Sequence, residues 1–244
     1  MESIASRNQI TLRGSLRELP AFSHENHGKR FFRFFLEVPR LSGAVDILPV
    51  IAEQATVDAM DPSGGGLLTV TGQVRSHNIR EGGRRHLSVF VFASAITAEE
   101  GEPINTVRLD AAVCREPTYR RTPLGREICD VMLAVPRAFH RADYLPCILW
   151  GKIAAQAAGC AVGDRILLDG RLQSRIYTKL TEEGAEERTA YEISAMTAEF
   201  PAPEESSDFC HRMVLFGRDI CTARNPRCAQ CPLSMFCTVG VPKE

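Results

Sequence analysis

Four cysteines near the end of the chain have the type and spacing of cluster or metal ligands. They follow the pattern Cys221-x6-Cys228-x2-Cys231-x5-Cys237. Four thiolates this close together can ligate an iron–sulfur cube, in which each iron takes one sulfur ligand from the protein. Zinc is the competitor, but structural zinc sites usually present two close Cys or His pairs, and only Cys228 and Cys231 form one here. The pattern therefore favours a [4Fe–4S] cluster on Cys221, Cys228, Cys231 and Cys237.

The rest of the composition describes an ordinary globular chain. Its 244 residues are 44% hydrophobic and 24% charged, with a net charge of -1. No apolar run approaches the roughly 18 residues of a membrane span, and the N-terminus lacks the basic start and apolar stretch of a signal peptide. We expect a cytoplasmic protein with reduced thiols. Because none of them forms a close pair, four cysteines are predicted to be small core hydrophobes: Cys114, Cys129, Cys147 and Cys160.

An internal duplication organises the chain. Val38-Pro-Arg-x5-Asp-x-Leu-Pro49 recurs as Val135-Pro-Arg-x5-Asp-x-Leu-Pro146, at an offset of 97 residues. Three further matches keep the order: Asn8 with Asn105 at 97, Gly72-Gln-Val-Arg-Ser76 with Gly170-Arg-Leu-Gln-Ser174 at 98, and Ser94-Ala-Ile-Thr-Ala-Glu99 with Ser194-Ala-Met-Thr-Ala-Glu199 at 100. These matches predict two copies of one domain, over 1–104 and 105–200, followed by an extra segment at 201–244.

Each copy alternates apolar and polar residues, which is the period of half-buried strands. In the first copy we expect strands over 10–16, 31–38, 45–51, 67–76 and 86–96, a helix over 53–60, and a Gly-rich connector at 62–66. In the second we expect strands over 107–113, 164–174 and 189–197, two paired strands within 129–150, a helix from Lys152 to about Gly159, and loops at 116–125 and 179–188. Five strands with a helix after the third is the order of an OB-fold.

The predicted fold class is thus all-β, with two tandem five-stranded OB-fold barrels that each carry one short helix. A small helical, cysteine-rich segment follows them. Residues 201–207 have the composition of an extended linker, and 208–219 have the pattern of a helix with Asp208 at its N-cap.

The second copy resembles the bacterial replicative single-stranded DNA-binding protein family over the whole of 105–200. The resemblance rests on the order and spacing of four motifs: Asn105-x-Val-x-Leu, Pro117-x-Tyr-Arg-x-Thr-Pro-x-Gly, Tyr144-x-x-x-x-Leu-Trp-Gly-Lys152 and Gly170-Arg-Leu-Gln-Ser-Arg175. Such domains bind single strands by stacking bases on aromatic rings, with cations along the backbone.

By this resemblance, the stacking positions of the family fall on Phe139, Tyr144, Trp150 and Tyr177. Tyr144 and Trp150 stand six apart on one predicted strand and so share a face. Leu145, Cys147 and Leu149 supply the inward face of that strand; the alternative is that the two rings fill the barrel. The resemblance implies these phosphate partners: Arg120, Arg121, Arg137, Arg141, Lys152, Arg171, Arg175 and Lys179.

The first copy departs from the family at every stacking position, where it has Ser42, Ile47, Glu53 and Ile79. We therefore hypothesise that it mainly builds the oligomer or contacts the DNA backbone. The cations available for such contacts are Lys29, Arg30, Arg33, Arg75, Arg80, Arg84 and Arg85.

The cysteine tail is similar to the end of the endonuclease III family of DNA glycosylases. Cys210-His211, Gly217-Arg218 and Ala223-Arg-x-Pro-Arg227 accompany the four cysteines. In that family the segment holds a [4Fe–4S] cluster that shapes a basic loop against DNA, which Arg224 and Arg227 match. The likeness covers about 35 residues and includes no counterpart of the catalytic Lys and Asp. We interpret the tail as a fused cluster-binding module; the alternative is an inert remnant.

Three hypotheses on function follow from these motifs. The leading one is a non-enzymatic, sequence-tolerant single-stranded DNA-binding protein of replication, recombination and repair. The others are a glycosylase or lyase of the endonuclease III type, and a primosome-like OB-fold interaction protein. The resemblance implies four OB-folds in the working unit, hence a dimer of this chain, and replication or repair proteins as partners. In the family these dock on an acidic, apolar tip, whose place the cysteine module takes here.

Overall fold

The computed structural model describes residues 8–60, 66–81, 84–137, 141–181, 184–201, 219–222 and 227–231, with the backbone alone at 80–81, 84–85 and 179–181. Most of this chain is strand, and no helix within it is long and apolar enough to cross a membrane. The elements in chain order are β1 (Asn8–Leu16), β2 (Ala21–Asn26), β3 (Lys29–Pro39), β4 (Val45–Glu53), α1 (Gln54–Asp58), β5 (Leu67–Glu81), β6 (Arg84–Glu99), β7 (Ile104–Val113), β8 (Thr118–Arg121), β9 (Glu127–Arg137), β10 (Arg141–Trp150), α2 (Gly151–Ala157), β11 (Arg165–Thr181), β12 (Gly184–Glu199) and a 3-10 turn η3 (Cys228–Gln230).

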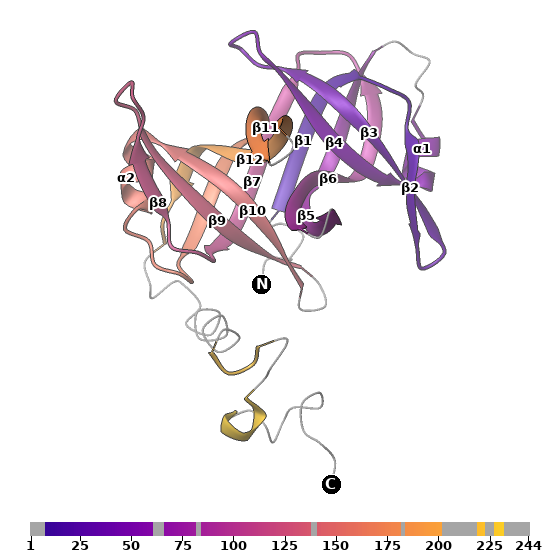
Figure 1. Cartoon of the computed structure of the whole chain (residues 1–244). Coiled ribbons are helices and arrows are strands. Elements are labelled where there is room, and N and C mark those ends of the chain that lie inside the picture. The colour runs from indigo at the N-terminus through magenta and orange to yellow at the C-terminus, as the bar shows by residue number, and fades with distance from the viewer. Residues whose placement is uncertain are drawn as a thin grey trace.

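The strands form two barrels of the same topology, β1–β6 and β7–β12 (Figure 1). In the first, β3 pairs with β1 and β4, and the parallel pair β4–β6 closes the barrel against the β5–β6 hairpin. In the second, β9 pairs with β7 and β10, and β10–β12 is the corresponding parallel pair. Each short helix follows the third long strand, so the predicted tandem OB-fold architecture is confirmed.

The two barrels join edge to edge through β1 and β7, which pair antiparallel. Ile10 stands opposite Val107 in this ladder, and the repeat offset of 97 makes these two residues equivalent. The barrels are therefore related by a pseudo-twofold axis that passes between Ile10 and Val107. One continuous sheet of twelve strands results.

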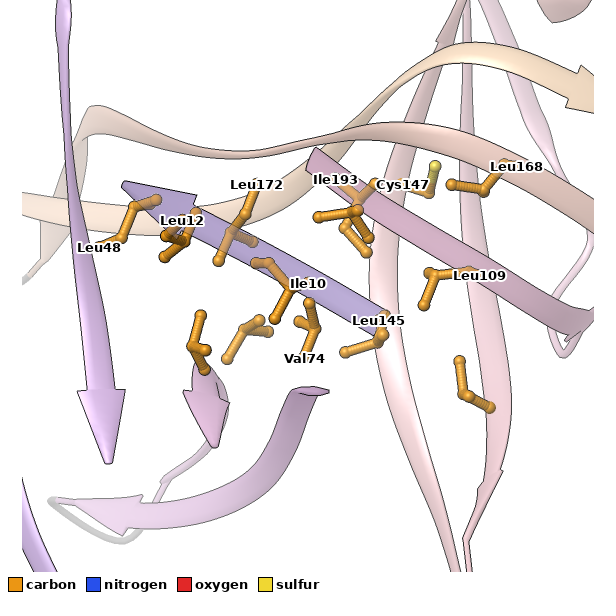
Figure 2. Close-up of a cluster of buried hydrophobic side chains, with 14 of the residues drawn as sticks. Ile10, Leu12, Leu48, Val74, Leu109, Leu145, Cys147, Leu168, Leu172 and Ile193 are labelled. Atoms are coloured by element: carbon orange, nitrogen blue, oxygen red, sulfur yellow. The ribbon is translucent and has the colours of Figure 1, made fainter. Parts of the chain in front are cut away.

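The hydrophobic core is continuous across the junction (Figure 2). Ile10, Leu12 and Leu48 from the first barrel belong to the same buried cluster as Leu145 and Leu172 from the second. Complete burial of such a side chain stabilises the fold by about 1.5–3 kcal/mol. The shared core and the β1–β7 ladder therefore hold the barrels in one fixed arrangement.

Two strands and one hairpin depart from the sequence prediction. The segment 116–125, predicted as a loop, contains β8, and β2 was not predicted. The predicted loop at 179–188 is mostly strand, because β11 and β12 run on as a long hairpin. Every residue of β2 and β8 is exposed, so neither strand has the apolar alternation on which the prediction depended.

The third of the four repeat matches is confirmed, and the fourth is wrong by two residues. Gly72 and Gly170 are equivalent, since an added Cβ would meet Phe92 O at 2.1 Å in one and Ser194 O at 2.5 Å in the other. Ser94 forms the bulge beside Gly72, whereas the bulge beside Gly170 is at Met196. Ser94 and Ser194 are therefore not equivalent, because the second hairpin has two more residue pairs than the first between its bulge and its turn.

Candidate functional site

The outer face of β10 carries the two aromatic rings that the sequence placed there. Tyr144 and Trp150 are 46% and 37% exposed, whereas the alternate residues Leu145, Cys147 and Leu149 are buried in the core. The predicted inward and outward faces of this strand are therefore confirmed, and the rings do not fill the barrel. Cys129, like Cys147, is a buried free thiol, as expected, whereas Cys114 and Cys160 are only half-buried.

A polar layer on β11 and β12 supports these rings. Trp150 Nε1 donates to Ser194 Oγ at 3.1 Å. Beside it, Gln173 Nε2 donates to the buried carboxylate of Glu192 at 2.9 Å, and Arg175 Nε lies 3.3 Å from the same oxygen. Arg175 in turn stands 5.6 Å from the ring centroid of Tyr177, which is 37% exposed. Gln173 and Ser194 belong to repeat motifs to which the sequence assigned no binding role, and Glu192 belongs to none of the motifs.

The cations assigned to phosphate have different surroundings. On β11, Arg171, Arg175 and Tyr177 share one face by strand alternation. Arg120 reaches the same side of the sheet and pairs with Asp130 at 2.6 Å. Arg121 occupies the opposite face of β8 and pairs with Glu127 at 3.0 Å. Arg141 and Lys152 are exposed. Phe139 and the side chain of Lys179 lie outside the described residues.

Arg137 belongs to a different constellation, the duplicated Val-Pro-Arg and Asp-x-Leu-Pro motif. Its Nη1 lies 3.4 Å from Asp143 Oδ1, and the first copy repeats the pair with Arg40 and Asp46. Each aspartate is fully buried and accepts a hydrogen bond from the other barrel. These pairs form two reciprocal clamps across the junction, which we call the Asp46 clamp and the Asp143 clamp.

In the Asp46 clamp, Asp46 Oδ1 accepts from Ser174 N at 2.7 Å and from Ser174 Oγ at 3.2 Å, while Ser174 Oγ accepts from Ile47 N at 3.2 Å. Arg40 Nε donates to Asp46 Oδ2 at 2.7 Å, and Arg40 Nη2 donates to Ser174 O at 3.0 Å. Hydrogen bonding to the carboxylate raises the pKa of Arg40. The arginine thus stays charged and ties both barrels together.

The Asp143 clamp repeats this geometry less completely. Asp143 Oδ1 accepts from Ser76 N at 2.8 Å, and Ser76 Oγ accepts from Tyr144 N at 2.8 Å. Within the described residues, Asp143 Oδ2 has no hydrogen-bond partner. Burial raises the pKa of Asp143, against the opposing effects of the Ser76 amide, Arg137 and Arg75. The Asp143 clamp therefore holds a less well compensated charge, beside the predicted stacking residue Tyr144.

Three of the four tail cysteines are described. Cys231 N donates to Cys228 O at 3.1 Å across the turn η3, and Arg227 N donates to Ile220 O at 2.8 Å. These bonds bring the segment of Cys221 beside that of Cys228, and all three thiols are free. Within the described residues, no group of three His, Cys, Asp or Glu side chains is arranged to hold a metal ion. An all-thiol donor set suits an iron–sulfur cluster or zinc; Cys237, the fourth predicted ligand, lies outside the described residues, as do 202–218.

The fold and the ring-bearing face define a tandem OB-fold protein. Comparison with known proteins agrees: the crystal structure of the wild-type single-stranded DNA binding protein from Thermus aquaticus superposes with a TM-score of 0.64 at 24% identity, over 80% of this chain and 93% of that one. A deletion mutant of that protein gives 0.65 at 23% identity, over 82% and 97%. These likenesses show the fold.

Sequence comparison assigns the family. A profile of the single-strand binding protein family matches residues 104–201. Single-stranded DNA-binding protein B of Bacillus subtilis is 35% identical over 112 residues, which are 42% of this chain and 96% of that protein. The single-stranded DNA-binding protein of Bacillus cereus is 33% identical over 109 residues, which are 41% of this chain and 61% of that protein. The chain belongs to the single-strand binding protein family.

A second profile, the iron–sulfur binding domain of endonuclease III, matches residues 221–237. The match begins at Cys221 and ends at Cys237, so it spans the four predicted ligands. This profile matches no residue of the two barrels. The likeness to endonuclease III is thus confined to the short cysteine motif.

Proposed function

We propose that this protein binds single-stranded DNA with little sequence preference and acts in replication, recombination and repair in the cytoplasm. The single observation that carries the proposal is the outward-facing pair of Tyr144 and Trp150 on β10. Base–aromatic stacking is sequence-tolerant because every base offers a π face. Tyr177 extends the ring surface onto β11, and Phe139 is the fourth stacking residue of the proposal.

The cations around this face supply the backbone contacts. Arg171 and Arg175 precede Tyr177 on the same face of β11. Arg141 begins β10, Lys152 is in α2 directly after it, and Arg120 is on β8. The ion pair of Arg120 with Asp130 is exposed, so a phosphate can replace the carboxylate at small cost. Phosphate contacts release counterions, and the affinity should therefore fall with added salt. We assign Arg137 to the Asp143 clamp rather than to the DNA.

The test uses the only tryptophan in the chain as its reporter. Titration with oligo-dT at low salt should quench Trp150 fluorescence. Tyr144→Ile copies the residue at the equivalent position of the first barrel, Ile47. The Tyr144→Ile variant lacks one stacking ring and should therefore bind oligo-dT more weakly, by about 1–3 kcal/mol. Tyr119→Ile is the matched control, because this ring is 41% exposed on β8 away from the face that carries Arg120. If oligo-dT did not quench Trp150 fluorescence in the wild-type protein, the proposal would be refuted.

The family resemblance supports two further parts of the proposal. Two chains would supply the four OB-folds of a working unit, which sedimentation can measure. The tail would hold a [4Fe–4S] cluster on Cys221, Cys228, Cys231 and Cys237, with zinc as the competing occupant. The cluster motif is the specific observation that favours a repair setting over replication alone. We assign no glycosylase or lyase reaction to it, because a base-flipping enzyme needs a pocket beside catalytic groups.

A further inference from the structure

The first barrel carries outward-facing aromatic rings at positions where the second barrel has none. On the outer face of β3 and β6, Phe35 and Phe92 each lie under an arginine: Arg33 stands 4.7 Å from the Phe35 centroid, and Arg75 stands 3.8 Å from that of Phe92. The equivalent positions in the second barrel hold Met132 and Ser194. The first barrel therefore has no aromatic residue at the stacking positions of the family, but it has aromatic residues on the neighbouring strands.

One of these rings lines a groove at the junction of the barrels. The groove has a volume of about 630 Å³ and is lined by Phe35 and Ile47 of the first barrel and by Ser174, Ile176 and Tyr191 of the second. Burial raises the pKa of Tyr191, and the positive charge of Arg33 opposes this rise. The positive charge of Arg33, which stands beside Phe35, therefore acts on the Tyr191 hydroxyl across the junction.

The groove adjoins a second hollow, which is lined in part by Tyr177. This hollow of about 330 Å³ is also lined by Pro146, which lies two residues from Tyr144 on the same face of β10. Thr189 and Tyr191 line both hollows. A strand bound at Tyr144 and Tyr177 therefore ends beside a hollow that shares Thr189 and Tyr191 with the groove of Phe35.

The pseudo-twofold axis shows that the fold does not require these rings. It relates Phe35 to Met132, and Tyr191, which pairs with Ser174, to Val89, which pairs with Ser76. The same barrel topology therefore accommodates methionine at the first place and valine at the second. Two rings and a neighbouring arginine in an open groove are the elements that bind an unpaired base and its phosphate.

We propose that Phe35, Tyr191 and Arg33 form a second stacking site for single-stranded nucleic acid, so that one strand runs from the second barrel onto the first. The inference rests on the proposed function of the second barrel and extends it across the junction. It adds base stacking to the hypothesis that the first copy mainly builds the oligomer or contacts the DNA backbone. Stacking has moved from the positions of Ile47 and Ile79 to Phe35 and to Tyr191 of the facing hairpin.

The test compares two lengths of DNA. An OB-fold covers about 4–16 nucleotides, so dT of about 8 nucleotides occupies the second barrel alone and dT of about 30 nucleotides crosses the junction. The double variant Phe35→Met, Tyr191→Val copies the equivalent residues of the other barrel, and its urea midpoint should show that the fold is retained. Phe22→Met is the matched control, because Phe22 is an exposed ring on β2 that packs edge-on against Phe32, outside the groove.

Fluorescence anisotropy at fixed salt should show the double variant binding the longer strand about tenfold or more weakly, and the shorter strand within about twofold of wild type. The Phe22→Met variant should match wild type on both. Photo-crosslinking of wild-type protein to an iodouracil-substituted strand of about 30 nucleotides should label Phe35 or Tyr191, which tests the site without any variant.

Equal affinity of the double variant and wild type for the longer strand would overturn the inference and leave the proposed function standing. Crosslinks confined to the outer face of β10 would do the same. Failure of the wild-type protein to bind either strand would instead refute the proposed function, and the inference with it.

Discussion

Removal of the Asp46 carboxylate should loosen the junction between the barrels. In Asp46→Ala, the half-buried Ser174 amide loses its 2.7 Å acceptor, and Arg40 loses the partner of its Nε at 2.7 Å. Breaking one side of a buried ion pair costs about 3–5 kcal/mol, because the remaining charge stays uncompensated. Arg40 is 21% exposed and can recover some hydration, so we expect the lower end, about 3 kcal/mol.

The matched control is Asp169→Ala. Asp169 also pairs with an arginine, Arg108 at 2.9 Å, but both side chains are more than half exposed. An exposed pair contributes about 0–1 kcal/mol. The two variants thus remove the same chemical group and differ in burial and in the contact across the junction.

Urea unfolding followed by Trp150 fluorescence measures the difference. At a slope of about 2 kcal/mol per molar urea, Asp46→Ala should lower the midpoint by about 1.5 M, and Asp169→Ala by less than about 0.5 M. Trp150 is in the second barrel and Asp46 in the first, so a shift seen by this reporter shows that the clamp couples them. Equal shifts in the two variants would refute the account of the clamp.

Two further predictions concern the other clamp and the tail. Burial raises the pKa of Asp143 above its ordinary 3.8, so its contribution to stability is fully present below that value and is lost as the pH rises through the raised pKa. The urea midpoint of wild type, relative to that of Asp143→Asn, should therefore be highest at low pH and should fall as the pH rises. A difference between the two midpoints that does not change with pH would contradict this role of Asp143. Anaerobically purified protein should absorb broadly near about 400 nm; Cys228→Ser should lose this band, whereas Cys160→Ser, whose thiol has a pKa raised by burial to about 11, should keep it. A colourless wild-type protein with stoichiometric zinc would exclude the iron–sulfur cluster.

The sequence determined the barrels and the outward rings because both depend on local periodicity. Apolar alternation in the segment from Val131 to Val135 specified a strand. The six-residue spacing of Tyr144 and Trp150 puts both rings on one face of their strand, and this does not depend on the rest of the fold. The same logic failed for β2 and β8, whose residues are all exposed. Strands that bury nothing leave no apolar period to detect.

Only the tertiary structure decided what the duplicated motif does. Asp46 and Ser174 are 128 residues apart, and the sequence gives no reason to pair a motif in one copy with a serine in the other. The same holds for Phe35 and Tyr191, which line one groove because the long hairpin of one barrel reaches over the other. Periodicity is a property of each segment, whereas the clamps and the groove depend on how β1 and β7 dock the two copies.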